Sequence, residues 1–143
     1  MSYQKILVAL DGSPRATSVR NAALELARAT GARLVLFRAV SLPVEMTPEV
    51  FVLSPDELQG HLEKRARDAL DVLAKEIPAA LLEGTAVRVG TPWQAILAEA
   101  RDRSADLVVI GSHGHRALDT ILGTTASRVV GHADRAVLVV RPT

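Results

Sequence analysis

Cysteine is absent from the 143 residues, and aromatic side chains make up only 3% of them. The lack of thiols excludes disulfides, thiolate nucleophiles and cysteine-ligated zinc. No apolar run approaches the length of a membrane span, and Met1–Lys5 lacks the layout of a signal peptide, so we expect a cytoplasmic protein. The formal net charge of +1 gives no general attraction to nucleic acid or to an anionic membrane.

Aliphatic residues dominate instead, since hydrophobic residues account for 48% of the chain. They gather in five short apolar runs that alternate with segments of helical character. This alternation predicts one α/β domain over residues 1–143, with a single open five-stranded parallel sheet and helices on both faces. The expected strands are residues 6–10, 34–40, 86–89, 107–110 and 136–140, and the expected helices end near residues 30, 77, 104 and 132.

Two helix starts have a clear sequence signature. Ser54-Pro55-Asp56-Glu57 is a capping box with proline at the first helical position, and Thr91-Pro92-Trp93-Gln94 repeats the same arrangement. The segment 41–54 before the first of them is longer than most connections in compact domains. It is either a disordered surface loop or a lid or partner contact.

The segment from Gly111 to Thr125 carries most of the functional signal. It follows a buried strand, contains Gly111 and Gly114 at the strand exit, and ends in Gly123-Thr124-Thr125 at the start of a helix. Glycine lets a backbone approach a phosphate closely, and the free amides of a helix start favour negative charge. The segment is typical of a phosphate cradle, although glycines also serve as turn residues and Gly-Thr-Thr as a plain helix cap.

The topology of such a sheet indicates where a ligand would bind. Ligands lie beyond the carboxyl ends of the strands, where the strand order reverses, so Asp11 and Gly111 would emerge side by side if their strands are neighbours. Asp11 could accept hydrogen bonds from a sugar or a base, or could only complete the Asp-Gly-Ser-Pro turn. His113 and His115 could contact phosphates, or could belong to a solvated loop.

Several catalytic signatures are missing from the chain. There is no Gly-Lys-Ser/Thr of a Walker loop and no Gly-x-Ser-x-Gly of a hydrolase elbow. A phosphoacceptor receiver needs clustered acids after the first strand, where only Asp11 is available. No general base stands near the glycine segment in sequence, so we expect binding with at most slow hydrolysis rather than an enzyme.

Several motifs together resemble those of a known family, the universal stress proteins, over the whole chain. They are Lys5–Ser13, Gly90-Thr91-Pro92, Asp106–Gly114, Gly123-Thr124 and Val137–Pro142. The resemblance implies a Rossmann-like fold of the adenine nucleotide alpha hydrolase-like type. It also implies a homodimer joined through the last strand, Val137–Val140, an apolar edge that soluble proteins normally cover or pair.

Within this family the glycine segment separates ATP binders from proteins that do not bind nucleotide. The binders that the chain resembles have nine residues between Gly-x-x-Gly and Gly-Ser or Gly-Thr, whereas this chain has eight, His115 to Leu122. All three glycines and the hydroxyl are retained, so the resemblance implies binding of ATP, or of ADP or AMP, with Mg²⁺ held mainly by phosphates and water. The implied contacts are Asp11 to the adenosine, the backbone of Ala39 and Val40 to the adenine edge, Gly111 and Gly114 to the ribose and phosphates, and Gly123, Thr124 and Thr125 to the outer phosphates.

Two functions of different classes follow from these observations. The first is a regulatory module that responds to occupancy by an adenine nucleotide. The second is a nucleotide-free dimeric interaction protein, in which the glycines serve only the turn. An ATP-consuming enzyme is a more distant third.

Overall fold

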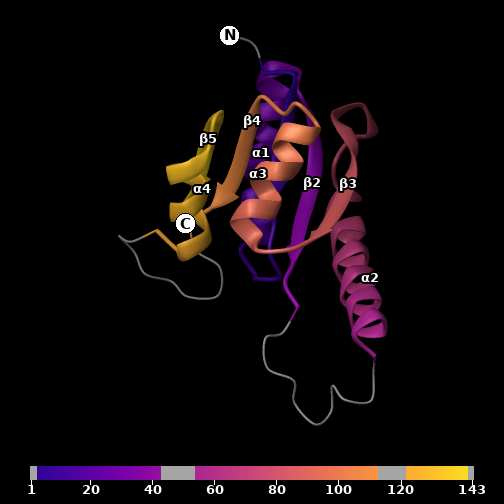
Figure 1. The fold of residues 1–143 in the computed structure, drawn as a ribbon. Coiled ribbons are helices and arrows are strands. Elements are labelled where there is room, and N and C mark those ends of the chain that lie inside the picture. The colour runs from indigo at the N-terminus through magenta and orange to yellow at the C-terminus, as the bar shows by residue number, and fades with distance from the viewer. Residues whose placement is uncertain (1–2, 43–53, 113–121, 142–143) are drawn as a thin grey trace.

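The computed structural model describes residues 3–42, 54–112 and 122–141. Five parallel strands form one sheet in the order β3-β2-β1-β4-β5, which confirms the predicted fold class (Figure 1). In chain order the elements are β1 (Lys5–Ala9), α1 (Ala16–Thr30), β2 (Arg33–Val40), α2 (Pro55–Ala74), the short 3-10 helix η2 (Ala79–Leu81), β3 (Leu82–Val89), α3 (Pro92–Asp102), β4 (Leu107–Gly111), α4 (Thr124–His132) and β5 (Ala136–Val140).

The central strands are buried on both faces, which explains their unbroken apolar runs. Successive side chains of β1 point to opposite faces, so Ile6 and Val8 join one core cluster while Leu7 and Ala9 join the other. The first cluster contains the apolar stripe of α1, and the second contains residues of α3 and α4. Figure 1 accordingly shows α3 in front of the sheet and α1 behind it. The sheet is therefore the middle layer of three.

Strand β3 begins four residues earlier than the sequence predicts, at Leu82 instead of Ala86. The first part of β3 contains Gly84, a weak strand former, so the sequence pattern does not predict a strand there. The pairing with β2 nevertheless begins at Leu34↔Leu82 and, after a shift of register between Leu34 and Val35, runs to Val40↔Val89. Pairing with β2 therefore determines where β3 begins.

The two predicted helix caps have different outcomes. Ser54 accepts a hydrogen bond from the Glu57 amide at 3.1 Å, as expected for a capping box. Thr91 makes no such side-chain bond, so the prediction of a second capping box is wrong in this detail. Helix α3 begins instead on Pro92, whose fixed φ suits the first turn, and on the bond from the Ala95 amide to the Thr91 carbonyl at 2.9 Å.

Candidate functional site

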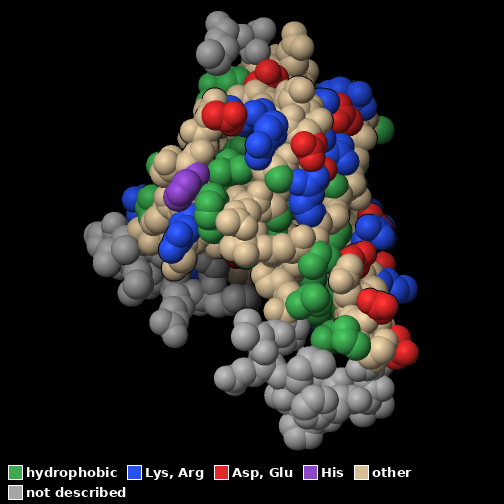
Figure 2. All heavy atoms as spheres, viewed as in Figure 1, with side chains coloured by type: hydrophobic (Ala, Val, Ile, Leu, Met, Phe, Trp, Pro, Cys, Tyr) green, Lys and Arg blue, Asp and Glu red, His purple; other side chains and the backbone are tan. Residues whose placement is uncertain are grey.

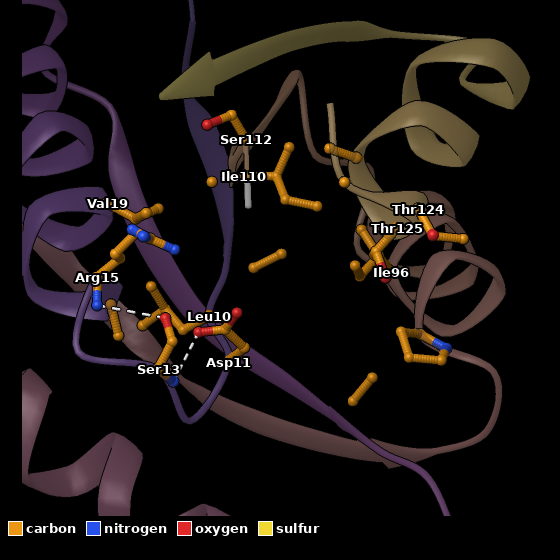
Figure 3. A pocket seen from close by; sticks show the side chains of 17 residues that line it. Leu10, Asp11, Ser13, Arg15, Val19, Ile96, Ile110, Ser112, Thr124 and Thr125 are labelled. Carbon is orange, nitrogen blue, oxygen red and sulfur yellow. Dashed lines mark hydrogen bonds between the residues drawn. The ribbon is translucent and has the colours of Figure 1, made fainter. Parts of the chain in front are cut away.

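The candidate site lies at the carboxyl ends of β1 and β4, where the strand order reverses. The two strands are paired in parallel, with Ala9 opposite Ile110, so the chain leaves them side by side toward Asp11 and beyond Gly111. This confirms the neighbourhood of strands on which the predicted location depends. A cavity of about 240 Å³ opens at this point (Figure 3).

One wall of the cavity is the turn between β1 and α1, which contributes Asp11, Ser13 and Arg15. The Ser13 amide donates to Asp11 Oδ1 at 2.9 Å, and the Arg15 amide donates to Ser13 Oγ at 3.3 Å (Figure 3). Asp11 therefore both completes the turn and lines the cavity, so the two roles considered for it are compatible. Its second oxygen, Oδ2, is not needed for the turn.

The opposite wall is the start of α4, which contributes Gly123, Thr124, Thr125 and Ala126. The first helical hydrogen bond runs from the Ser127 amide to the Gly123 carbonyl at 2.9 Å. The amides of residues 124 to 126 therefore precede this bond and have no partner within the helix. They form the end of a helix dipole that favours an anion.

Gly123 has a different role from the one implied by the resemblance. Its amide donates to the Ser112 carbonyl at 2.7 Å, and the Ser112 amide donates to the Val140 carbonyl at 2.9 Å. These bonds hold the start of α4 against the ends of β4 and β5. The Gly123 amide is thus engaged within the protein, and Thr124 and Thr125 are the predicted donors that remain.

The third side of the cavity is apolar and is formed by Ala39, Pro92, Ile96 and Ile110. It brings together the end of β2, the first turns of α3 and the end of β4. Figure 3 shows Ile96 and Ile110 around the same space as Asp11. Such a surface suits the flat, weakly polar ring of a base.

Val40 is not part of this lining, contrary to the prediction. It is 7% exposed, and its carbonyl accepts the Gly90 amide at 2.9 Å. The contact predicted for Val40 is through its backbone, and the bond from Gly90 engages the carbonyl of that backbone within the protein. Two other predicted residues, His113 and Gly114, lie outside the described residues.

Several lining residues were not foreseen from the sequence, chiefly Arg15, Pro92 and Ile96. The Gly90-Thr91-Pro92 motif was a usable signal for the second of them, because it places a helix start next to a strand end. Ile96 lies one turn further along the same helix. Arg15 had no signal of its own beyond its position just after the Asp-Gly-Ser-Pro turn.

The charged groups of the described lining are Asp11 and Arg15. Within residues 3–42, 54–112 and 122–141, no three side chains among His, Asp and Glu are grouped to hold a metal ion. In the same ranges, no helix has the length and the apolar character needed to cross a membrane. The lining combines an apolar side with the amides at the start of α4, and it is therefore suited to a small ligand with an apolar part and an anionic part.

Comparison with known proteins identifies the family of the chain. The model of the universal stress protein family matches residues 2–141. The universal stress protein Sll1388 of Synechocystis is 31% identical over 153 residues, covering 99% of each chain. The solved UspA of Lactobacillus plantarum is 28% identical with a TM-score of 0.79 and covers 99% of each chain.

A second solved structure, a universal stress protein in complex with cAMP, is 26% identical to this chain. It has a TM-score of 0.71 and covers 100% of both chains. The family match spans nearly the whole sequence, and the α/β fold matches that of the solved UspA over 99% of each chain. The chain belongs to the universal stress protein family.

Proposed function

We propose that the protein binds an adenine nucleotide in the cavity between β1, α3 and α4. The observation that carries the proposal is the division of the lining into an apolar side and an amide-rich side, facing each other across the switch point of the sheet. The base would lie against Ala39 and Ile96, the sugar near Asp11, and the phosphates at the first turn of α4. The solved relative in complex with cAMP supports an adenine nucleotide in a chain of this fold.

ATP with Mg²⁺ is the form of the ligand that the glycine motif favours. Mg²⁺ usually keeps several waters and takes its protein ligands from one or two carboxylates. The described residues group no three metal-ligating side chains, and the described lining has one carboxylate, Asp11, so the ion would be held mainly by phosphate oxygens and water. Thr124 and Thr125 line the wall at the start of α4, and their hydroxyls would either complete the coordination of the Mg²⁺ ion or donate hydrogen bonds to the phosphates.

The proposed role is regulatory, with no rapid turnover of the nucleotide. A hydrolase would need a base that activates water in line with the outer phosphate. The carboxylate of the described lining is Asp11, which lies at the β1 turn and binds the Ser13 amide. In the proposed pose Asp11 contacts the sugar, and it lies across the cavity from the start of α4 (Figure 3).

We also propose a homodimer through the edge of β5. Leu138 is 40% exposed in the middle of this strand, and its neighbours along the strand are half-buried. An apolar edge strand of this kind is normally paired or covered. Sedimentation velocity at tens of micromolar protein tests this, with a dimer expected and a monomer contradicting it.

The binding proposal is tested by calorimetry and thermal melting with ATP and Mg²⁺. At about a hundredfold excess of ligand over the dissociation constant, binding adds about 2.7 kcal/mol to the free energy of unfolding. For a chain of this size, this raises the melting temperature by roughly 5–10 °C. No shift at millimolar ATP, ADP or AMP would refute the proposal and favour a nucleotide-free interaction protein.

A matched pair of variants locates the site. Ala39→Leu adds apolar volume inside the cavity, whereas Ala22→Leu adds the same volume at another half-buried alanine, on α1 outside the lining. We expect Ala39→Leu to abolish the ligand-induced shift and Ala22→Leu to retain it. Equal shifts in both variants would show that the nucleotide binds elsewhere.

A further inference from the structure

Arg15 has an unusual position for a cationic side chain. It is the N-cap residue of α1, with φ −80° and ψ −8°, and its side chain makes no capping bond. Helix starts prefer Ser, Thr, Asp or Asn at this position, and a positive charge there opposes the helix dipole. Local helix stability therefore gives no reason for an arginine at this residue.

The position of Arg15 in the cavity gives such a reason. Its side chain is half-buried and lines the same space as Thr124 and Thr125. Figure 3 shows Arg15 on the α1 side and the two threonines across from it on the α4 side. A group placed between these walls would meet a guanidinium from one direction and helix amides from the other.

The helix starts at the cavity share a second feature. Neither α1 nor α4 has an acidic residue in its first turn. Helix α2, which contributes nothing to the described lining, has Asp56 and Glu57 in its first turn and a serine cap. The start of α1 has the carboxylate of Asp11 close by, bound to the Ser13 amide, whereas the start of α4 has no acidic residue in its first turn and carries about half a positive charge.

The sum of these charges points to an anionic ligand. Arg15 and the start of α4 together outweigh the single carboxylate of Asp11 in the described lining. A nucleoside is neutral and would gain nothing from this excess, whereas a nucleotide phosphate would. The planar guanidinium donates two parallel hydrogen bonds, which match the oxygens of a phosphate.

We infer that Arg15 binds the ligand's phosphate opposite the start of α4, and that it makes this cavity select nucleotides over nucleosides. This inference rests on the proposed function, because it assigns a residue to the phosphate of the proposed adenine nucleotide. It also fixes the direction of the ligand. The phosphate lies between Arg15 and Thr124–Ala126, and the sugar hydroxyls, which are donors, lie toward Asp11.

Calorimetry with AMP and with adenosine, in buffer without Mg²⁺, tests the inference on three forms of the chain. These are the natural protein, Arg15→Gln, and Arg28→Gln as a control that removes the same charge from the last turn of the same helix. We expect Arg15→Gln to weaken AMP binding about 10- to 100-fold, as the loss of a charged hydrogen bond does, and to leave adenosine binding unchanged. Arg28→Gln should change neither affinity.

A second readout separates phosphate binding from a merely structural effect. The second ionisation of a free phosphate monoester has a pKa of about 6, and a bound guanidinium favours the dianion. In a ³¹P NMR titration, AMP bound to the natural protein should therefore ionise at lower pH than AMP bound to Arg15→Gln. Arg15→Lys keeps the charge without the planar donor pair, so it should retain part of the affinity for AMP and part of the lowering of the ionisation pH of bound AMP.

The outcomes distinguish this inference from the proposed function. If the natural protein binds AMP and Arg15→Gln, folded by circular dichroism, binds it equally well, the role of Arg15 is refuted and the nucleotide site stands. Equal affinity of the natural protein for AMP and adenosine refutes it too. If the natural protein binds neither compound at millimolar concentration, the proposed function fails, and the assignment of Arg15 fails with it.

Discussion

Glu99 is the residue whose replacement most directly tests how α3 is held on the sheet. Figure 2 shows acidic and basic side chains close together on the face of the molecule where α3 lies. The Glu99 side chain is 11% exposed and bridges two arginines, with Oε2 at 2.6 Å from Arg103 Nε and Oε1 at 3.3 Å from Arg88 Nε. Glu99 lies one turn beyond Ile96, which forms part of the cavity wall. The perturbation is Glu99→Gln, which keeps the size of the side chain and removes its charge.

The loss in free energy of unfolding caused by Glu99→Gln lies between two limits. Breaking a fully buried ion pair costs about 3–5 kcal/mol, whereas an exposed pair contributes about 0–1 kcal/mol. Each arginine is 32% exposed, and each keeps another carboxylate, since Arg88 contacts Asp102 at 2.6 Å and Arg103 contacts Glu83 at 3.7 Å. We therefore expect Glu99→Gln to lower the free energy of unfolding by about 1–2 kcal/mol.

Urea denaturation and thermal melting measure this change. The midpoints should fall, by about 3–6 °C in the thermal case, with the slope of the urea transition unchanged because the same surface is exposed on unfolding. Asp102→Asn is the control, because Asp102 is 61% exposed and pairs with the same Arg88. Its effect should be smaller. A Glu99→Gln variant as stable as the natural protein, or less affected than Asp102→Asn, would refute this reasoning.

The remaining predictions concern acid stability, two glycines and the sheet edge. A hydrogen bond from an arginine holds the pKa of Asp102 and of Asp134 below the usual value. The stabilisation that these carboxylates contribute is therefore present above about pH 4 and is lost as the pH falls through their folded pKa values. Replacing both by asparagine should make the melting temperature fall less steeply in acid, and an unchanged pH profile would contradict this. Gly31→Ala should destabilise the protein by about 1 kcal/mol because φ is +78° there. Gly60→Ala, within helix α2 and in open space, should stabilise it by up to about 1 kcal/mol. Urea titrations in which both variants change the free energy of unfolding in the same direction would contradict the backbone described. Leu138→Lys should convert the proposed dimer to monomer in sedimentation without unfolding it, and a dimer that persists would place the interface elsewhere.

The fold was predictable from the sequence because its central strands are buried on both faces. Apolar runs such as residues 107–110 and the glycine stop at Gly31 are local signals, and the structure agrees with them to within a few residues. The start of β3 was not predictable in this way. It depends on pairing with β2, which no local pattern around Gly84 reveals.

The site was predictable only where topology alone places a residue at the switch point. Asp11, Gly111 and Thr124 follow strand ends or begin a helix there, and all line the cavity. Ala39 lines the cavity as well, whereas Val40 next to it does not. Arg15 was missed because its role depends on a wall that the chain builds more than a hundred residues later.

A crystal structure of the protein with a bound adenine nucleotide tests the central claim most directly. We expect the base against Ala39 and Ile96, and a phosphate within hydrogen-bond distance of the Thr124 and Thr125 amides. A nucleotide bound elsewhere on the molecule, or a cavity that stays empty at millimolar nucleotide, would contradict it.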